Sequence, residues 1–549
     1  MPAPTDLRLP ALHVSGLDVW FGTRQVLQDL DLTVPPGRRT GLVGENGSGK
    51  STLLRALAGT LPSRALVSGT VDVPADLVML VQEPPFRDHA TIGAVLAGAL
   101  VPLRRMVADV ERLSADVTDE TGQTAYAAAL DLAVAHEAWH ADRRAAESAE
   151  RLGLGALDPA REVGTLSGGQ RTRLALATMM TTRPSCLVLD EPTNHLDDDA
   201  VEQLTAFLRD LPGVVVLASH DRVLLDDVCT DLFDLDPSEL GTDGRGGRRF
   251  GGGWTAYEEQ RAATRRRWEV TYEAQQEELD RLRAATRVGT SSIAHNRPPR
   301  DNDKFIYGFK GANVDRTLAR RKRDAERRLA IAEREQVRKP RPPLELRTEL
   351  TAAGTAGRLV QVRDLEVVRR LRVDRLDVEA GEHVLVSGAN GSGKTTLLGV
   401  LSGRLQPTSG SVSVAARRVA ELVQDVRFDE PGRSAHATYD VLVGPERAAR
   451  TPLPQLGLLP PDRHGTPVAL LSVGQRRRLG LAIAVAAAPD LLLLDEPTNH
   501  ISLALAGELE EALQTTPGTV VVASHDRWLR RRWAGTELCL SPVVVSGRG

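Results

Sequence analysis

Short apolar runs and long charged stretches alternate along this chain. Two of the runs, Cys186 to Leu189 and Leu491 to Leu494, stop abruptly at acidic residues. Runs of this length are typical of strands buried on both faces of a parallel sheet. Two further strand-like runs, Thr40 to Val43 and His383 to Val386, stop at glycine-rich loops. Such strands, separated by helical stretches, predict an α/β fold.

A different pattern, helical and strongly charged, separates these two groups of strands. Apolar residues form one stripe in each of two stretches, about Tyr257 to Thr286 and Val314 to Lys339. The stripes consist of Trp268, Tyr272, Leu279 and Leu282, and of Leu318, Ala325, Leu329 and Ala332. This spacing predicts two helices of roughly 40 Å that pack as an antiparallel hairpin. The turn between them, at about 287–313, is long and basic.

The chain is a tandem repeat. The loop GENGSGKST returns as GANGSGKTT, and LSGGQ, LVLDEPTNH and LASHDR return as LSVGQ, LLLLDEPTNH and VASHDR. The last three pairs share an offset of 305 residues, whereas the glycine-rich loops are 344 residues apart. We therefore expect a first domain over 1–250, a helical linker over 251–345 and a second domain over 346–549.

The first copy carries about 39 extra residues between its glycine-rich loop and LSGGQ, most of them after Gln82. Within this piece, the stretch from Leu103 to Leu152 is rich in Ala, Glu and Arg with helical spacing. We predict an inserted helical arm at about 100–155. The alternative is a longer form of a helical subdomain that has no separate role.

Each glycine-rich loop follows a predicted strand and opens a helix, so that backbone N–H groups converge on phosphates. Lys50 and Lys394 are predicted to neutralise the β- and γ-phosphates, and Ser51 and Thr395 to bind Mg²⁺. ATP and Mg²⁺ are therefore the predicted cofactors. The predicted loop contacts to ATP are Gly44, Glu45, Asn46, Gly47, Ser48, Gly49, Lys50, Ser51 and Thr52, and Gly388, Ala389, Asn390, Gly391, Ser392, Gly393, Lys394, Thr395 and Thr396.

Two acidic residues follow each apolar run, and this pattern predicts ATP hydrolysis. Asp190 and Asp495 are expected to help hold Mg²⁺, partly through water. Glu191 and Glu496 are expected to orient or deprotonate the attacking water. Beside a phosphate-binding loop, a purely structural role for such a pair is the weaker interpretation.

Two further pairs of side chains are predicted to complete the sites. His220 and His525 follow apolar strands in identical SHDR contexts and are expected near the γ-phosphate. Gln82 and Gln424 lie 32 and 30 residues after the loop lysines. We expect both glutamines to contact the metal and to relay its presence to the helical region that follows.

Composition narrows the class of protein. The three cysteines form no CxxC pair, which excludes a disulfide framework or a zinc knuckle and fits a reducing cytoplasm. The N-terminus has no signal-peptide pattern. The apolar stretch from Leu479 to Ala488 is about ten residues long, whereas a membrane span needs roughly 20. We therefore expect a cytoplasmic protein without a membrane span.

The LSGGQ and LSVGQ motifs resemble the signature of ATP-binding-cassette proteins. The resemblance implies two P-loop cassettes in tandem, joined by the long helical hairpin. It also implies that each signature completes the ATP site of the opposite cassette. The implied contacts are Ser167, Gly168, Gly169 and Gln170 of the first copy and Ser472, Val473, Gly474 and Gln475 of the second.

The two copies are not equivalent. Phe21, 29 residues before Lys50, is predicted to stack on adenine, whereas the matching stretch LEVVRRLRV has no aromatic residue. The guanidinium of Arg369 is the candidate there. After EPTNH, the first copy continues with Leu196 and Asp197 and the second with Ile501 and Ser502. Unequal hydrolysis rates are therefore expected.

Over nearly its whole length the chain resembles the ABC-F family, on the DEPTNH motifs, the insert and the charged linker. The stretch from Asp301 to Leu329 resembles the linker of actinomycete antibiotic-resistance members. The resemblance implies binding near the tRNA exit site of the ribosome and protection against macrolide, lincosamide or streptogramin drugs. A housekeeping role in translation stays open. The alternative is the ATP-binding subunit of a drug exporter that docks on a separate membrane protein.

Charge favours the ribosome. From Trp254 to Pro343 there are 22 Lys/Arg and 14 Asp/Glu, a net charge of +8, so the rest carries −12 of the total −4. A basic hairpin on acidic cassettes suits phosphate-rich RNA, and aromatic residues between cations suit unpaired bases. A solvated hairpin with an apolar brace at its turn is the alternative. The predicted contacts to ribosomal RNA and P-site tRNA are Lys304, Phe305, Tyr307, Lys310, Arg320, Arg321 and Arg323. No DNA partner is expected, and the chain is expected to be a monomer.

Overall fold

The structure of the protein is a computed structural model. It describes residues 9–541 apart from 45–46, 82–85, 116, 195, 236–245, 288–319, 321, 338–349, 351–356, 390 and 499–502. The chain divides into two compact units. One contains Met1–Asp236, Arg245–Thr255 and Pro343–Gly549, and therefore both repeats; the other contains Pro237–Gly244 and Ala256–Pro342.

In the first repeat, a six-stranded sheet forms the centre of the cassette, with strand order β5-β6-β7-β3-β8-β9. All neighbours are parallel except β8 and β9. The strands are Val78–Leu80, Cys186–Asp190, Val214–Ala218, Arg39–Val43, Asp231–Asp234 and Arg248–Gly251. Helices α1, α5, α6 and α7 accompany them, at Lys50–Leu57, Gly168–Thr182, Asp198–Asp210 and Arg222–Val228. The predicted α/β class is confirmed.

A second, antiparallel sheet in the same cassette was not predicted from the hydrophobic pattern. Its order is β2-β1-β4, over Arg24–Val34, Leu12–Phe21 and Ala65–Asp72. Leu12, Val14 and Val19 of β1 are buried and pack in one core with Leu42 and Val188 of the parallel sheet. The two sheets therefore share a hydrophobic core.

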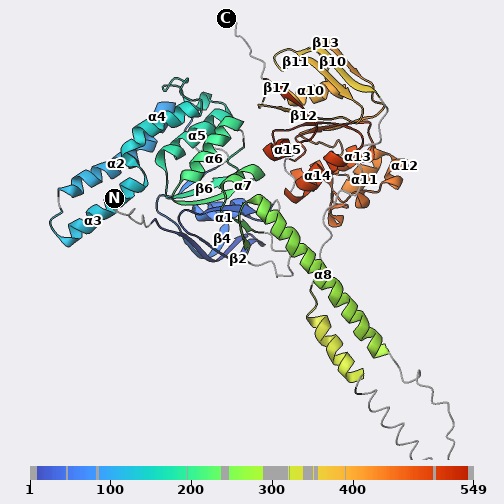
Figure 1. Cartoon of the computed structure of the whole chain (residues 1–549), viewed down its shortest axis with the longest axis horizontal. Helices are drawn as coiled ribbons and strands as arrows, with labels where there is room; N and C mark the ends of the chain where they lie inside the picture. Colours follow the sequence, from blue (N-terminus) through green and yellow to red (C-terminus); the bar gives the residue numbers. More distant parts are fainter. Residues whose placement is uncertain are drawn as a thin grey trace, which may run out of the picture. The chain divides into compact units, whose positions relative to one another are not determined.

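The second repeat has the same architecture (Figure 1). Its parallel sheet has the order β14-β15-β16-β12-β17, over Val419–Leu422, Leu491–Asp495, Thr519–Ala523, His383–Gly388 and Thr536–Leu540. Its antiparallel sheet has the order β11-β10-β13, over Leu371–Glu379, Arg358–Val367 and Ser409–Val414. Its helices are α10 at Lys394–Leu401, α11 at Ala435–Val443, α12 at Pro445–Arg450, α13 at Val473–Ala486, α14 at Leu503–Thr515 and α15 at Arg527–Arg532.

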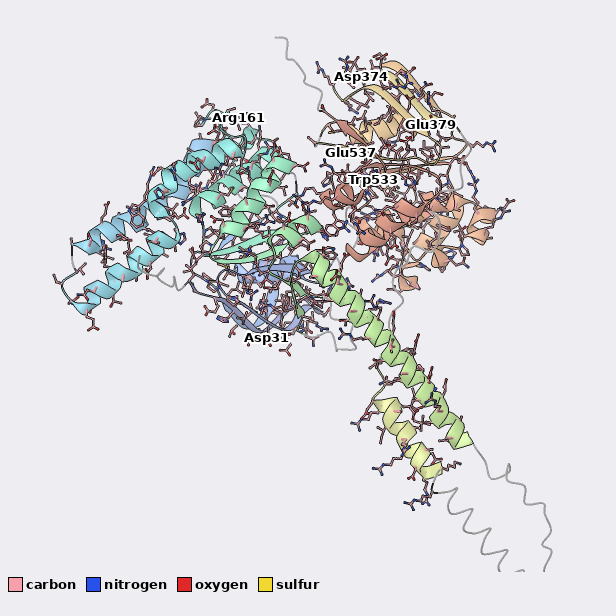
Figure 2. The ribbon with its side chains drawn as sticks, viewed as in Figure 1. Asp31, Arg161, Asp374, Glu379, Trp533 and Glu537 are labelled. Carbon is pink, nitrogen blue, oxygen red and sulfur yellow. The ribbon has the colours of Figure 1, made fainter. Side chains whose placement is uncertain are left out.

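Strand β11 shows that the antiparallel sheet of the second repeat has one buried face and one face exposed to water. Leu371, Val373 and Val378 are buried, whereas Asp374 and Glu379 are exposed (Figure 2). Antiparallel strands with one buried face carry this alternation of apolar and polar residues.

Three helices occupy the stretch in which the extra residues of the first copy fall. They are α2 at Ile92–Ser114, α3 at Glu120–Ala135 and α4 at Ala141–Arg151, and α2 and α3 lie side by side (Figure 1). The hydroxyl of Thr91 and the carboxylate of Asp119 cap the starts of α2 and α3. Leu103, Val110 and Ala133 belong to a separate small core in this arm. The boundaries of the arm and its role stay predictions.

The second unit contains most of α8, Trp254–Arg287, and a second helical stretch over 322–334. Arg283 lies 3.5 Å from Glu333, and the N–H of Val337 donates to Gln275 at 2.9 Å. These contacts have the order expected of antiparallel helices. The tip at about 287–313 falls almost wholly outside the described residues. No helix among the residues that the structure describes is long and apolar enough to cross a membrane.

The packing of α8 can be tested with a matched pair of substitutions. Leu279, on the predicted stripe, is 1% exposed, whereas Val270 of the same helix is 65% exposed. We expect Leu279→Ala to destabilise the linker by about 2–5 kcal/mol and Val270→Ala to change its stability by less than about 0.5 kcal/mol. Amide hydrogen exchange of α8 in the full chain measures both. Equal protection in the two variants would contradict the assignment of the stripe.

Candidate nucleotide-binding and hydrolysis sites

Glycines with left-handed backbone angles place both phosphate-binding loops. Gly49 precedes α1 with φ 104°, and Gly393 precedes α10 with φ 97°. A Cβ atom would lie 2.6 Å from Leu27 at Gly49 and 2.5 Å from the carbonyl oxygen of Arg370 at Gly393. Only glycine satisfies both constraints. Each loop therefore leads from a buried strand into a helix N-terminus, the backbone geometry that suits a phosphate group.

The loop lysines lie over their own loops. The ammonium group of Lys50 donates to the carbonyl oxygen of Gly44 at 2.8 Å, and that of Lys394 donates to Gly388 at 2.8 Å. The positive charge is thus already beside the backbone that would hold the phosphates. Among the predicted contacts, Glu45, Asn46 and Asn390 lie outside the described residues.

Hard oxygen ligands meet beside each loop. The hydroxyl of Ser51 donates to Asp190 at 3.2 Å. Burial raises the pKa of Asp495, and the Thr395 hydroxyl acts in the opposite direction. Both carboxylate oxygens of Asp495 are buried, and no hydrogen bond of ordinary geometry reaches them within the described chain. A buried carboxylate in this state suits a cation, and hydroxyl and carboxylate oxygens suit Mg²⁺.

Of the two glutamines predicted to contact the metal, the structure describes one. Gln82 lies outside the described residues. Gln424 follows β14, and its backbone carbonyl accepts a hydrogen bond from Arg477 at 3.2 Å. The predicted contact of its side chain with the metal stays a prediction.

The two candidate catalytic glutamates share an unusual backbone. Glu191 follows β6 with φ 49°, and Glu496 follows β15 with φ 50°. Their N–H groups donate to Ala218 at 2.9 Å and to Ala523 at 2.8 Å, at the ends of the neighbouring strands. A non-glycine residue in the left-handed region is strained, and such strain persists where the fold imposes it, often at functional sites. Both copies impose it at the same position.

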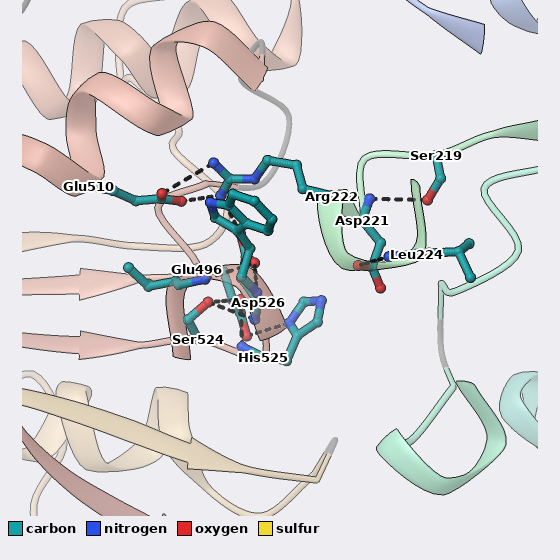
Figure 3. A network of polar contacts seen from close by, with 11 residues as sticks. Ser219, Asp221, Arg222, Leu224, Glu496, Glu510, Ser524, His525 and Asp526 are labelled. Carbon is teal, nitrogen blue, oxygen red and sulfur yellow. Dashed lines mark hydrogen bonds and ion pairs between the residues drawn. The ribbon is translucent and has the colours of Figure 1, made fainter. Parts of the chain in front are cut away.

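Each histidine contacts the glutamate of its own copy. The backbone N–H of His220 donates to Glu191 Oε2 at 3.0 Å, and ring atom Nε2 lies 3.4 Å from Oε1. The backbone N–H of His525 donates to Glu496 Oε2 at 3.3 Å, and ring atom Nδ1 lies 2.7 Å from Oε1 (Figure 3). The structure therefore brings together the glutamate and histidine predicted for each site.

The electrostatics of Glu191 favour proton transfer. Burial raises the pKa of Glu191 to about 7, against the opposing effects of the His220 N–H and of Lys50. In the second copy, the hydrogen bond to Glu496 raises the pKa of His525. A carboxylate whose pKa lies near neutrality is suited to accept a proton from water.

The signature serines begin helices. Ser167 caps α5 and accepts from the N–H of Gln170 at 3.3 Å, while Gln170 Oε1 accepts from the N–H of Ser167 at 3.0 Å. Ser472 and Gln475 repeat this arrangement at α13. The capping box fixes each serine hydroxyl at a helix N-terminus, where an anion is favoured. The pairing of each signature with the opposite P-loop stays a prediction.

The candidate adenine contacts lie at or just beyond the ends of the central strands of the antiparallel sheets. Phe21 is the last residue of β1, opposite Arg24 and Ala65, and packs partly against the core. Arg369 lies between β10 and β11 with φ 61°. Its neighbour Val368 is 53% exposed. Stacking of either side chain on a base stays a prediction.

Sequence reasoning missed Arg477, which is 3% exposed. Its guanidinium donates to the backbone carbonyls of Asp495 at 2.7 Å and Glu496 at 2.6 Å. Arg477 therefore fixes the backbone of the turn that carries the two acids of the second site. The first copy has Thr172 at this position, and the Thr172 hydroxyl donates to Gly168 instead. The mismatch between LSGGQRT and LSVGQRR was the available signal.

Asp197, the acid that differs between the copies, caps α6 and pairs with Arg173. Its counterpart Ser502 lies outside the described residues. Of the predicted RNA contacts, Arg320 and Arg323 are exposed on the second linker helix. The remaining ones, Lys304, Phe305, Tyr307, Lys310 and Arg321, lie outside the described residues.

Comparison with known proteins identifies the class of this protein. The family model described as ABC transporter matches residues 27–194 and 371–499. A crystal structure of a complex that contains an archaeal ribosome recycling factor aligns with a TM-score of 0.50 and 19% identity, over 92% of this chain and 83% of that one, which shows the fold alone. Fold, motifs and family model together define a tandem ATP-binding-cassette ATPase.

The relatives narrow this class. The tylosin resistance ATP-binding protein TlrC of Streptomyces fradiae is 37% identical over 98% of both chains. The energy-dependent translational throttle protein EttA of Mycobacterium tuberculosis is 31% identical over 93% of this chain and 88% of its own. The putative ATP-binding protein YdiF of Bacillus subtilis is 30% identical over 96% of this chain and 80% of its own. The chain belongs to the ABC-F family of ATPases.

The catalytic assignment predicts the behaviour of a double variant. Glu191→Gln with Glu496→Gln should nearly abolish ATP turnover while leaving ATP binding intact, because the amide keeps the shape but accepts no proton. Phosphate release and nucleotide affinity are the measurements. Turnover at a tenth of the wild-type rate or more would contradict the roles assigned to these two glutamates.

A second prediction concerns the asymmetry of the adenine contacts. With the second site blocked by Lys394→Ala, Phe21→Ala should weaken ATP binding by roughly 1–3 kcal/mol, the usual effect of losing a base stacked on an aromatic ring. With the first site blocked by Lys50→Ala, Val368→Ala should have little effect. Titration with a fluorescent ATP analogue tests both variants. Equal losses would show that the first copy has no special aromatic platform.

Proposed function

We propose that this ATPase binds the ribosome near the tRNA exit site and protects translation from antibiotics at the peptidyl-transferase centre or exit tunnel. The observation that carries the proposal is the likeness to TlrC over 98% of both chains, linker included. The name of that relative states tylosin resistance, and the name of EttA states a role in translation. On the ribosome the protein acts in the cytoplasm, as a monomer.

The distribution of charge on the linker supports an RNA partner. On α8, arginines pair with acids one turn away, as in Arg265–Glu269 and Arg281–Glu277, so this part is nearly neutral along its surface. In the second helix, cations outnumber acids between 320 and 328, and Arg320, Lys322 and Arg323 are exposed. The positive excess therefore gathers toward the tip. Phosphate contacts there would supply salt-dependent affinity.

The ATP sites would time the association. Each P-loop would bind one MgATP, and the signature serine of the opposite copy would complete its binding site. Two bound nucleotides would therefore hold the cassettes closed. Mg²⁺, held by Ser51 with Asp190 and by Thr395 with Asp495, would neutralise phosphate charge. Glu191 and Glu496 would then accept the proton of the attacking water. Hydrolysis would open the cassettes, and the protein would then dissociate from the ribosome.

Replacing the linker tip tests the proposal against the exporter alternative. We expect a variant in which Ser291 to Gly311 is replaced by a short Gly/Ser turn to keep its ATPase activity and to lose any drug resistance. The tip, rather than the cassettes, would reach the drug site. Drug susceptibility of cells and ATPase rate of the pure protein are the two measurements. Full resistance without the tip would contradict ribosome protection.

A charge-reversal control separates binding from protection. Arg320→Glu with Arg323→Glu should weaken co-sedimentation with ribosomes and flatten its dependence on salt, since each lost phosphate contact removes about one unit of the slope. Resistance that appears only with reduced drug accumulation in membrane vesicles would favour the exporter alternative.

A further inference from the structure

Each histidine motif continues with an aspartate and an arginine. These two residues form hydrogen bonds with the motif of the other copy. Each motif reads Ser-His-Asp-Arg, ending at Arg222 in the first copy and at Arg527 in the second. The guanidinium of Arg527 donates to Asp221 Oδ2, from Nη2 at 2.7 Å and from Nε at 3.2 Å. Arg222 Nη2 donates in turn to Asp526 Oδ2 at 3.3 Å. The contact is therefore reciprocal, as across a two-fold axis.

Each of these aspartates holds the turn that carries its histidine. In the second copy, the N–H of Asp526 donates to Ser524 Oγ at 3.0 Å, and Asp526 Oδ1 caps α15 by accepting from the N–H of Trp528 at 2.8 Å. Oδ1 therefore serves the local turn, whereas Oδ2 faces Arg222 of the other cassette. Asp221 does the same in the first copy, with the N–H of Leu224 at 3.0 Å. An arginine from one copy thus fixes the orientation of the aspartate in the other.

From Asp526 the contacts continue to the candidate catalytic glutamate. The hydroxyl of Ser524, which accepts from the Asp526 N–H, donates to Glu496 Oε2 at 3.3 Å. His525, between these two residues, contacts both oxygens of the same carboxylate. Figure 3 shows the path from Glu510 through Arg222 and Asp526 to Glu496. Arg222 of the first cassette is therefore linked to the Glu496 carboxylate through Asp526 and the hydroxyl of Ser524.

The two crossings differ in burial. Arg222 and Glu510 of α14 are 1% and 2% exposed and form two hydrogen bonds, one of them at 3.1 Å. The guanidinium also lies 5.3 Å from the ring centre of Trp528. Arg527 and Asp221 are 18% and 15% exposed. A buried charge pair leaves little freedom of position, because separating it exposes an uncompensated charge to a dry environment.

The sequence explains the difference. At the offset of 305 residues, Glu510 corresponds to Thr205 of the first copy. The Thr205 hydroxyl donates to the carbonyl of Val201 in its own helix, and a threonine carries no charge for Arg527. Arg222 is therefore held by two acids of the other copy, whereas Asp221 is the acid that holds Arg527 across the copies in the described chain.

We propose that Arg222 of the first cassette is a positioning residue for hydrolysis in the second site, where it fixes Asp526 and thereby the Ser524–His525 turn and the carboxylate of Glu496. This inference rests on the proposed role of Glu496 in hydrolysis. Arg527 holds Asp221 of the first copy less tightly, and there the turn contacts Glu191 through His220. Loss of the Arg222 fork should therefore lower the rate of hydrolysis in the second site and leave ATP binding there unchanged.

The test isolates one site at a time in the full chain. In a Glu191→Gln background the second site alone turns over, and there Arg222→Lys should lower kcat by about tenfold or more, since small misplacements of a catalytic group have effects of this size or larger. KM for ATP should stay within about twofold. Lysine keeps a positive charge beside Glu510, so the buried acid keeps a partner. It lacks the several N–H donors of the planar guanidinium that contact Glu510 and Asp526 together. In a Glu496→Gln background, Arg222→Lys should change kcat less than threefold, and Arg527→Lys should lower it more than Arg222→Lys does.

Two further variants separate positioning from general damage. Asp526→Asn should lower kcat of the second site like Arg222→Lys, and the double variant should be no slower than the slower single variant, because both act on one path. Arg531→Lys, which alters another contact between the copies at 3.6 Å from Asp227, should have no effect. Additive losses, equal losses at both sites, or a change in KM instead of kcat would overturn the inference. Turnover by the Glu191→Gln, Glu496→Gln protein would instead refute the underlying catalytic assignment.

Discussion

The central constraint on this protein is negative charge at the buried ends of parallel strands. Strands β6 and β15 each deliver two carboxylates into a region shielded from water, where an uncompensated charge is strongly disfavoured. In the second copy the compensation is built from buried cations: Lys394 is 8% exposed and Arg477 is 3% exposed. Phosphate, metal and water chemistry all depend on this balance, because the same low dielectric strengthens every interaction within it.

The two copies answer this constraint with different residues. The second copy places Arg477 beneath its acidic turn and Glu510 behind Arg222, whereas the first has Thr172 and Thr205 at these positions. Asp495 and Glu496 of the second site are 1% and 5% exposed, whereas in the first site burial raises the pKa of Glu191 to about 7. One fold therefore supports two sites with different electrostatics, and the difference arises from side chains just outside the repeated motifs.

Sequence reasoning predicted the parts of this architecture that local pattern determines. The strands before the P-loops, the helices that the P-loops open and the acids at the ends of β6 and β15 each follow from a short run of residues. The antiparallel sheets were missed, because β1 pairs with β4 residues that lie 44 to 59 positions further along the chain and the pairing register is interrupted by an irregularity. The left-handed backbone at Glu191 and Glu496 depends on hydrogen bonds to neighbouring strands, and the Arg222–Asp526 contact joins residues 304 apart. Neither has a local signature.

The burial of Arg222 also limits how the protein can be taken apart. A cassette expressed alone would present this guanidinium without the two acids that pair with it here, and the other cassette would expose Glu510 without Arg222. The copies are thus partners with complementary faces rather than interchangeable modules. A chimera whose second cassette had threonine at the Glu510 position would be covalently intact, but Arg222 would lose one of its two acidic partners between the copies. Fusion of both copies in one chain keeps the matched faces together at every round of synthesis.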